Sequence, residues 1–272
     1  MTSPSPPSSD STPCKACTWT PSCQIGRFYK SHVKIFYECS DRGLWSLGSQ
    51  LILKDRGARH PSNEVPNVQF VENASIPVPD ILESWEEDDG HKIILMRRVP
   101  GVPLAEVWPN LSSEEKENIA RQTAESLLQL RKLQSDKIQS LDGGQICDNF
   151  LFHADRDWKL FPTPFAPGLK TRCHPRNHIH PGDLTDVNIT VDKGCLSGII
   201  DWEHAGYLPV WWEYVNISVM NSEDKGWKAL LRKHMPDYIE SREWWRAYYW
   251  LCRDAEHEVA RGFIEETERE GA

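Results

Sequence analysis

The sequence predicts a bilobal α+β fold, in which a small N-terminal β-sheet lobe with one helix precedes a larger, mainly helical C-terminal lobe. Up to about residue 98, runs rich in β-branched and aromatic residues are separated by short polar breaks, as in the strands of a small sheet. From Val102 the apolar residues recur at helical steps instead. With 272 residues and a mass of 31.3 kDa, the chain can bury a core for both lobes.

Composition divides the chain into three parts. Residues 1–13 are rich in Ser and Pro, and we expect them to form a disordered tail. Residues 14–98 hold the strand-like runs and should form the N-terminal lobe. Residues 99–272 hold the helical runs and should form the C-terminal lobe of the same single domain.

In the N-terminal lobe, three segments have the composition of strands: Arg27–Cys39, Gln50–Lys54 and His91–Val99. Ser62–Val71 predicts a short helix with Pro66 in its first turn, because proline cannot donate a hydrogen bond inside a helix. Ile76–Pro79 should be extended, because a proline restricts the residue before it as well as itself. Gly43–Gly48 lacks the full glycine pattern of a phosphate-covering loop and reads equally well as a hairpin turn.

The C-terminal lobe begins with a long amphipathic helix. Ser112 and Glu115 form a capping box. At steps of three and four there follow Ile119, Thr123, Leu127, Leu130 and Leu133, a stripe that predicts a helix to about Gln134. Residues 141–179 show no clear period and should be an irregular connection. The segment Ser241–Glu268 predicts a C-terminal helix. Its expected buried stripe consists of Trp244, Trp245, Tyr248, Leu251, Val259 and Phe263.

The most informative stretch runs from His180 to Glu203. Two short β-branched runs flank the turn Lys193–Gly194, which predicts a β-hairpin. Asp183 and Asn188 come before the hairpin, and Asp201 follows its second strand. The two acids and the amide should therefore meet at the open end of the hairpin.

This order of residues fits the phosphoryl-transfer site of kinases. There, an Asp orients the attacking hydroxyl and accepts its proton, while a later Asn and a later Asp hold Mg²⁺ against the phosphates. Asp183 is accordingly the candidate catalytic base. Asn188 and Asp201 are the candidate metal ligands, since amide and carboxylate oxygens are hard ligands that suit Mg²⁺.

The same residues resemble the motif of a known family. Gly182-Asp-Leu184, Asn188-Ile189, Gly198–Glu203 and Gly206–Glu213 resemble the aminoglycoside phosphotransferase-like kinases of the protein-kinase-like superfamily, particularly a fungal branch. The resemblance covers most of the chain from about residue 35. It implies a bilobal protein-kinase-like fold and transfer of the γ-phosphoryl group of ATP, with Mg²⁺, to a hydroxyl of a small-molecule acceptor.

Four further residues are candidates for nucleotide binding. Lys54 ends an apolar strand, the position from which a lysine reaches the α- and β-phosphates in kinases. Glu64 lies at the start of the predicted helix and is the candidate partner of Lys54; as an acid in a first helical turn, it is equally explained by the helix dipole. The resemblance implies that the Arg97 carbonyl and the Val99 N–H pair with the adenine edge.

Two features depart from the family pattern. The family places a histidine two residues before the catalytic Asp, where this chain has Pro181, and His180 stands one position early. The segment Thr163–His180 is also short and rich in Pro where relatives carry a helical stretch beside the acceptor. A catalytically impaired pseudokinase, or nucleotide-binding scaffold, is therefore the alternative to an active kinase.

Composition excludes several classes of protein. The net charge of −9 and the pI near 5.6 argue against a general nucleic-acid binder, which would need a basic face. The longest apolar runs are too short to span a membrane. The N-terminus lacks the basic start and apolar core of a secretory signal, so we expect a cytoplasmic location.

The eight cysteines are scattered, and in the expected compartment they should be reduced thiols. Cys14, Cys17 and Cys23 could be part of a zinc site. No second CxxC or spaced pair of histidines completes a set of four ligands, so a zinc-binding interaction protein is the weaker alternative.

Overall fold

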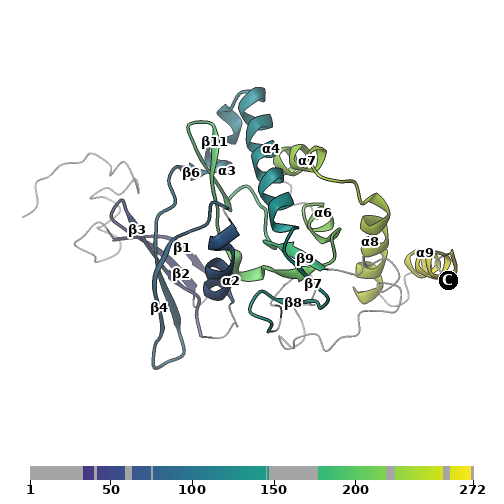
Figure 1. The fold of residues 1–272 in the computed structure, drawn as a ribbon, viewed down its shortest axis with the longest axis horizontal. Coiled ribbons are helices and arrows are strands. Elements are labelled where there is room, and N and C mark those ends of the chain that lie inside the picture. Colours follow the sequence, from purple (N-terminus) through teal and green to yellow (C-terminus); the bar gives the residue numbers. More distant parts are fainter. Residues whose placement is uncertain are drawn as a thin grey trace, which may run out of the picture. The chain divides into compact units, whose positions relative to one another are not determined.

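The computed structural model describes residues 33–39, 42–58, 63–74, 76–144, 146, 177–218, 224–253 and 258–270 (Figure 1). The described residues form helices and antiparallel sheets, and therefore an α+β fold. The chain divides into two compact units. One comprises residues 1–60 and 79–98, and the other comprises residues 61–78 and 99–272.

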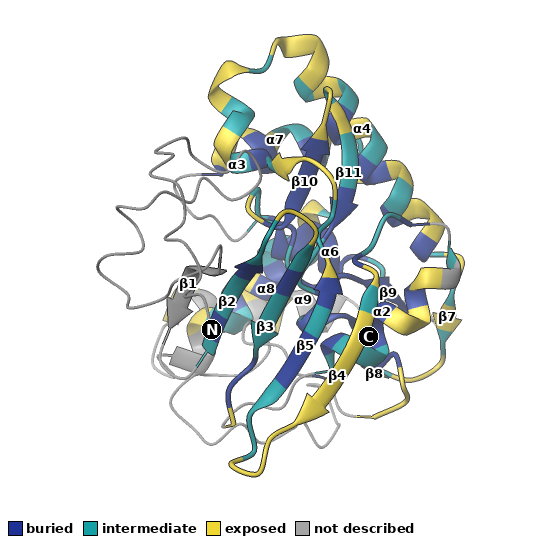
Figure 2. Cartoon of the chain, turned by 90° about the vertical axis from the view of Figure 1, so that its left-hand side faces the viewer, coloured by how far each residue is buried: buried dark blue, intermediate teal, exposed yellow. Residues whose placement is uncertain are grey.

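The first unit is a five-stranded antiparallel sheet with the order β1-β2-β3-β5-β4. Its strands are β1 (Val33–Cys39), β2 (Arg42–Leu47), β3 (Leu51–Asp55), β4 (Ile81–Glu86) and β5 (Lys92–Arg97). β3 and β5 carry buried aliphatic side chains, whereas β4 is exposed along most of its length (Figure 2). The sheet thus has its best-buried strands at its centre.

Two strands of this sheet were not predicted. The hairpin-turn reading of Gly43–Gly48 is wrong, because most of this run lies in β2, where Trp45 pairs with Leu53 of β3. β4 was missed because it is an edge strand rich in acids, which lacks a buried alternating pattern. The predicted strand Arg27–Cys39 is confirmed at Val33–Cys39, and residues 27–32 lie outside the described part.

The second unit begins with a short helix and contains two further small sheets, with the strand orders β11-β10-β6 and β7-β9-β12-β8. Its helices are α2 (Glu64–Val71), α3 (Leu104–Val107), α4 (Ser113–Leu130), α6 (Trp212–Asn216), α7 (Lys225–Lys233), α8 (Ile239–Arg253) and α9 (Glu258–Glu270). Three 3₁₀ helices, η1 (Glu72–Ala74), η2 (Trp108–Asn110) and η3 (Trp202–His204), connect other elements. Its strands are β6 (Val102–Pro103), β7 (Gln134–Ser135), β8 (Gln139–Ser140), β9 (Asn177–His180), β10 (Ile189–Asp192), β11 (Cys195–Ile199) and β12 (Gly206–Leu208).

The helix α4 begins with the predicted capping box. The Ser112 Oγ accepts a hydrogen bond from the Glu115 N–H at 3.2 Å, and the Ser112 N–H donates to Glu115 Oε2 at 2.8 Å. These bonds satisfy two of the main-chain donors that a helix start leaves unpaired. Four members of the predicted stripe, Ile119, Thr123, Leu127 and Leu130, are buried. The helix ends at Leu130, about four residues earlier than expected, so Leu133 lies beyond it and is only half-buried.

Tryptophans dominate the core at the C-terminal end of the second unit. Trp212 of α6 packs edge-to-face on Trp245 of α8, with ring centroids 4.8 Å apart. Trp211 and Trp244 are buried in the same cluster. Trp202 is also completely buried.

Two predictions for the rest of this unit are wrong. The expected helix Ser241–Glu268 is described as two helices, α8 and α9, and the expected burial of Val259 and Phe263 fails because both side chains are exposed. The segment 141–179 was expected to be irregular, but its end enters β9; residues 147–176 lie outside the described part. Within the described residues, no helix is both long and apolar enough to cross a membrane.

We expect Ser112→Ala to lower the free energy of unfolding by about 1 kcal/mol, because it removes the side-chain half of the capping box. Urea denaturation monitored by circular dichroism measures this change. Ser113→Ala is the matched control, since Ser113 lies one residue later, is exposed and makes no capping bond. Equal midpoints for the two variants would contradict the assigned role of Ser112.

Candidate functional site

The hairpin predicted for the site is present. β10 and β11 pair antiparallel, and the turn between them has positive φ at both central residues, 51° at Lys193 and 75° at Gly194. Positive φ at both positions defines the type I′ turn, whose twist matches that of two paired strands. At the open end, the Ile200 N–H donates to the Asn188 carbonyl at 2.9 Å. This bond places the main chain of Asn188 next to the residue that precedes Asp201.

The loop between β9 and β10 curls back on itself. The Thr185 N–H donates to Asp183 Oδ1 at 3.1 Å, and the Asn188 N–H donates to the Thr185 carbonyl at 3.0 Å. The Asn188 side-chain amide reaches the Asp183 carbonyl at 3.5 Å. Asp183 and Asn188 are therefore neighbours, although five positions separate them in sequence.

Asp201 follows β11 in the left-handed region, with φ 61° and ψ 65°. This conformation is uncommon for a residue other than Gly, although Asp adopts it more readily than most. Trp202 stabilises the turn, because its Nε1–H donates to the Ile199 carbonyl at 2.8 Å. The side chain of Asn67, on α2, donates to the carbonyls of Trp202 and Ala205 at 2.8 and 3.2 Å. Buried groups thus fix the backbone on which Asp201 stands.

Burial and charge act together on Asp183. Burial in the protein raises the pKa of its carboxyl group, and the negative charge of Asp201 raises this pKa further. The Thr185 N–H and the charge of His204 partly oppose these effects. The carboxylates of Asp183 and Asp201 are therefore close enough to repel each other, and a cation placed between them would relieve that repulsion.

Several residues from the rest of the second unit hold the Asp183 loop. The side-chain amide of Asn216 donates to the Gly182 carbonyl, and Trp227 Nε1–H donates to the Leu184 carbonyl at 2.9 Å. Gly182 has φ 93°, and a Cβ there would lie 2.6 Å from the carbonyl oxygen of His204. Asn216 and Trp227 were not predicted, because a single sequence carries no signal for contacts across 34 and 43 residues.

The displaced histidine is part of the interior. His180 is the last residue of β9, and its Nδ1 lies 3.2 Å from Glu213 Oε2. Both side chains are only 1% exposed. His180 therefore contacts α6 from the strand before the loop, and the motif Gly206–Glu213 contributes its partner.

The other predicted site residues lie in both units. Lys54 is half-buried on β3, and Glu64 is the buried first residue of α2. Arg97 ends β5, and its exposed side chain forms an ion pair with Asp80, with 2.7 Å between Arg97 Nε and Asp80 Oδ2. Val99 packs beside Gly198. Lys54 and Arg97 belong to the first unit, and Glu64 and Val99 to the second. The pairing of Lys54 with Glu64, and the adenine contacts of Arg97 and Val99, stay predictions.

The described residues do not contain a cluster of three or more His, Cys, Asp or Glu side chains arranged around a metal. The candidate set instead combines the amide oxygen of Asn188 with the carboxylate of Asp201, beside that of Asp183. Such all-oxygen sets suit Mg²⁺, which keeps several waters and uses few protein ligands. Cys14, Cys17 and Cys23 lie outside the described residues.

Asp183→Asn should stabilise the protein at pH 8 in EDTA, because the neutral amide removes both the cost of burying a carboxylate and its repulsion by Asp201. The pKa of Asp183 is raised in the folded state. Below the unfolded-state pKa its carboxyl group is protonated in both states and costs no stability, and the folded state is destabilised as pH rises through the folded-state pKa. Each ~1 kcal/mol of gain corresponds to about 2–4 °C in Tm. Differential scanning fluorimetry from pH 8 to pH 4 should show this gain shrinking as pH falls.

Asp192→Asn is the control for this comparison, since Asp192 is exposed at the other end of the hairpin. A wild type and an Asp183→Asn variant with equal Tm at pH 8, or a gain that does not depend on pH, would contradict the electrostatic account.

Most of the sequence matches that of a known family. The model of the phosphotransferase enzyme family matches residues 45–248, which is more than half of the chain. No curated protein sequence matches this chain significantly.

Solved structures of low sequence identity share the fold. A thermostable mutant of the aminoglycoside phosphotransferase APH(4)-Ia, in its apo form, is 16% identical, with a TM-score of 0.57 over 92% of this chain and 99% of that chain. The streptomycin–ATP ternary complex of APH(2")-IIa is 14% identical, with a TM-score of 0.54 over 91% of both chains. ADP-bound APH(2'')-Ib is 15% identical, with a TM-score of 0.53 over 90% of this chain and 94% of that chain.

These similarities confirm the predicted α+β kinase-like fold. The family match also covers the Asp183 loop and the β10–β11 hairpin, which carry the motif. The chain belongs to the phosphotransferase enzyme family, with the fold of the aminoglycoside phosphotransferases.

Proposed function

We propose that the protein transfers the γ-phosphoryl group of ATP to a hydroxyl of a small molecule. The family match supports phosphoryl transfer, and structural neighbours were solved with ATP, an ATP analogue or ADP. The observation that carries the proposal is the convergence of Asp183, Asn188 and Asp201 at the open end of one hairpin. A phosphotransferase needs such a site because its catalysis consists largely of positioning and charge stabilisation.

In this proposal Asp183 is the catalytic base. Its carboxylate would orient the acceptor hydroxyl and take the proton that the hydroxyl loses when it attacks phosphorus. Because its pKa is raised, Asp183 is a better proton acceptor than an exposed aspartate, and the hydrogen bond from the Thr185 N–H partly opposes this rise.

Asn188 and Asp201 would hold Mg²⁺. When bound, the ion neutralises charge on the phosphates that it contacts. The residues fit a cation, because the negative charge of Asp201 raises the pKa of Asp183 and the side chain of Asn188, a neutral oxygen ligand, lies within 3.5 Å of the Asp183 carbonyl. The strained backbone at Asp201, fixed by Trp202 and Asn67, would keep its carboxylate in place when the nucleotide arrives.

Four residues would bind the nucleotide itself. Lys54 would contact the α- and β-phosphates, with Glu64 holding its ammonium group in place. The main chain of Arg97 and Val99 would meet the adenine edge. One boundary between the two compact units lies between Arg98 and Val99, which supports a hinge at this segment.

A second function has its own support. Pro181 occupies the position of the family's histidine, and His180 is buried against Glu213 instead. A pseudokinase that binds nucleotide without transferring phosphate fits this departure. The segment Thr163–Arg176, which would help to choose the acceptor, lies outside the described residues.

Asp183→Asn should lower Mg²⁺-dependent turnover of ATP by about 10²–10⁴-fold, the usual contribution of a positioned base. Turnover is measured as ADP release and as phosphorylated product with a panel of hydroxyl acceptors. Asp192→Asn should retain wild-type turnover, because Asp192 is an exposed aspartate of the same hairpin. If Asp183→Asn turns over ATP as fast as the wild type does, the proposed mechanism is wrong.

Nucleotide binding should be detectable without any acceptor. Mg²⁺-ATP at 100 times its Kd should stabilise the wild type by about 2.7 kcal/mol, seen as a rise in Tm. Lys54→Met should reduce this rise, while Lys92→Met, on the neighbouring strand β5, should not. A thermal shift without product from any acceptor would favour the pseudokinase, and the absence of a shift would exclude both functions.

A further inference from the structure

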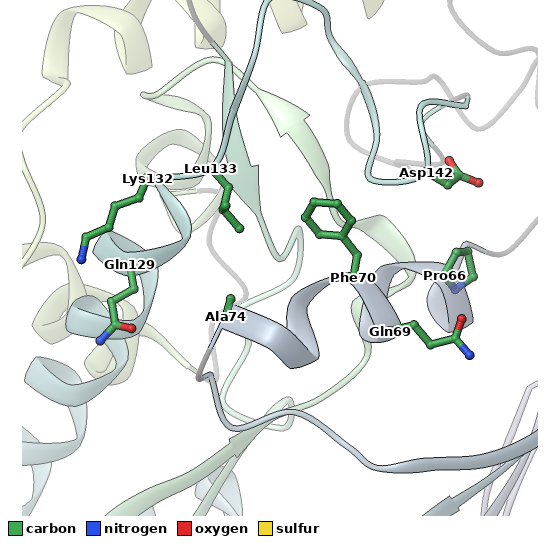
Figure 3. Close-up of a pocket in the computed structure, with 8 residues that line it drawn as sticks. All are labelled: Pro66, Gln69, Phe70, Ala74, Gln129, Lys132, Leu133 and Asp142. Atoms are coloured by element: carbon green, nitrogen blue, oxygen red, sulfur yellow. The ribbon is translucent and has the colours of Figure 1, made fainter.

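A hollow of about 800 Å³ lies within the second unit, away from the Asp183 loop (Figure 3). One wall is α2 with the following η1, and the other is formed by the C-terminal end of α4 with the residues after it. Its volume falls in the range of small-molecule sites. Figure 3 shows Lys132 at one end, Asp142 at the other, and Phe70 and Leu133 between them.

The middle of the hollow is apolar. Phe70 is 38% exposed, which is high for a large aromatic side chain. The ring of Phe70 packs edge-to-face with that of Tyr207, with ring centroids 6.3 Å apart. Leu133 and Pro66 also line the hollow and are half-buried. A ligand with a flat or aliphatic body would cover this apolar surface.

The two charged ends are not equivalent. Asp142 already accepts hydrogen bonds from Ser140 Oγ at 2.7 Å and from the Gly144 N–H at 2.9 Å, and these bonds lower its pKa. Lys132 is exposed, and its ammonium group makes no ion pair with a residue that the structure describes. Both bonds to Asp142 come from neutral donors and end on its Oδ1, so Asp142 keeps its negative charge. The Lys132 end is therefore the one with hydrogen-bond donors that no described acid holds.

We propose that this hollow binds an amphiphilic anion, an aromatic or aliphatic acid whose apolar body covers Phe70 and Leu133 and whose acid group faces Lys132.

The site is also connected to the candidate active site. Asn67 lies on α2, one turn before Phe70, and is completely buried. Its amide donates to the carbonyls of Trp202 and Ala205, in the turn that follows Asp201. A ligand that packs on α2 therefore acts on the backbone beside Asp201. This regulatory clause rests on the proposed function, whereas binding to the hollow does not.

The test of binding uses 8-anilinonaphthalene-1-sulfonate, an aromatic sulfonate, titrated by fluorescence into the full chain. Phe70→Ser and Lys132→Gln should each weaken its Kd at least about five-fold. The matched controls Leu128→Ser and Lys137→Gln replace an exposed leucine and an exposed lysine outside the hollow, and should bind as the wild type does. Circular dichroism confirms that each variant is folded.

Equal Kd values for the wild type, Phe70→Ser and Lys132→Gln would overturn the site. The cationic dye thioflavin T tests the sign of the ligand. If it binds more tightly than the sulfonate and loses its binding in Asp142→Asn, the assignment of an anionic ligand is wrong.

Hydrogen–deuterium exchange tests the connection without nucleotide. Saturating dye should slow exchange in peptides that cover residues 200–208 of the wild type, with no change in Phe70→Ser. Peptides from α7 should be unaffected. Unchanged exchange at 200–208 with the dye bound would overturn the connection, and this result would stand whether or not the protein transfers phosphate.

Discussion

The hydrogen bond from the Ile200 N–H to the Asn188 carbonyl is the constraint on which the candidate site depends. It closes the open end of the β10–β11 hairpin, while the type I′ turn at Lys193–Gly194 fixes the register at the other end. Together they bring a residue before the hairpin and a residue after it to the same place. An amide and a carboxylate that are thirteen positions apart in the numbering, Asn188 and Asp201, thereby become neighbours.

Contacts with the rest of the second unit hold this arrangement in place, although its local charge and backbone conformation cost free energy. Asp183 is buried and lies near a second carboxylate, and Asp201 adopts a left-handed backbone. Such costs persist only where the surroundings determine the conformation. Here Asn67, Asn216 and Trp227 supply buried donors to the carbonyls of the two loops. Function and stability therefore oppose each other at this site, as is usual for polar groups assembled to bind charge.

How much the sequence predicts depends on how local each signal is. The hairpin was predictable, because its turn residues and β-branched runs lie within a dozen positions, and so was the Ser112 capping box. The strand β4 was not, because its exposed acidic surface has no buried face to mark it. The partners of the Asp183 loop were missed for a different reason. Asn216 and Trp227 carry no local signal in the sequence, and only the folded chain shows that they contact the carbonyls of Gly182 and Leu184.

At the open end of the hairpin, the charges of Asp183 and Asp201 lie close enough to interact. A double-mutant cycle with Asp183→Asn and Asp201→Asn, read as free energies of unfolding at pH 8 in EDTA, measures this interaction. Either substitution alone removes the mutual repulsion, so the double variant should gain less stability than the two single variants combined. Additive effects, within the ~0.3–0.5 kcal/mol expected for independent sites, would show that the carboxylates do not interact and would contradict the account.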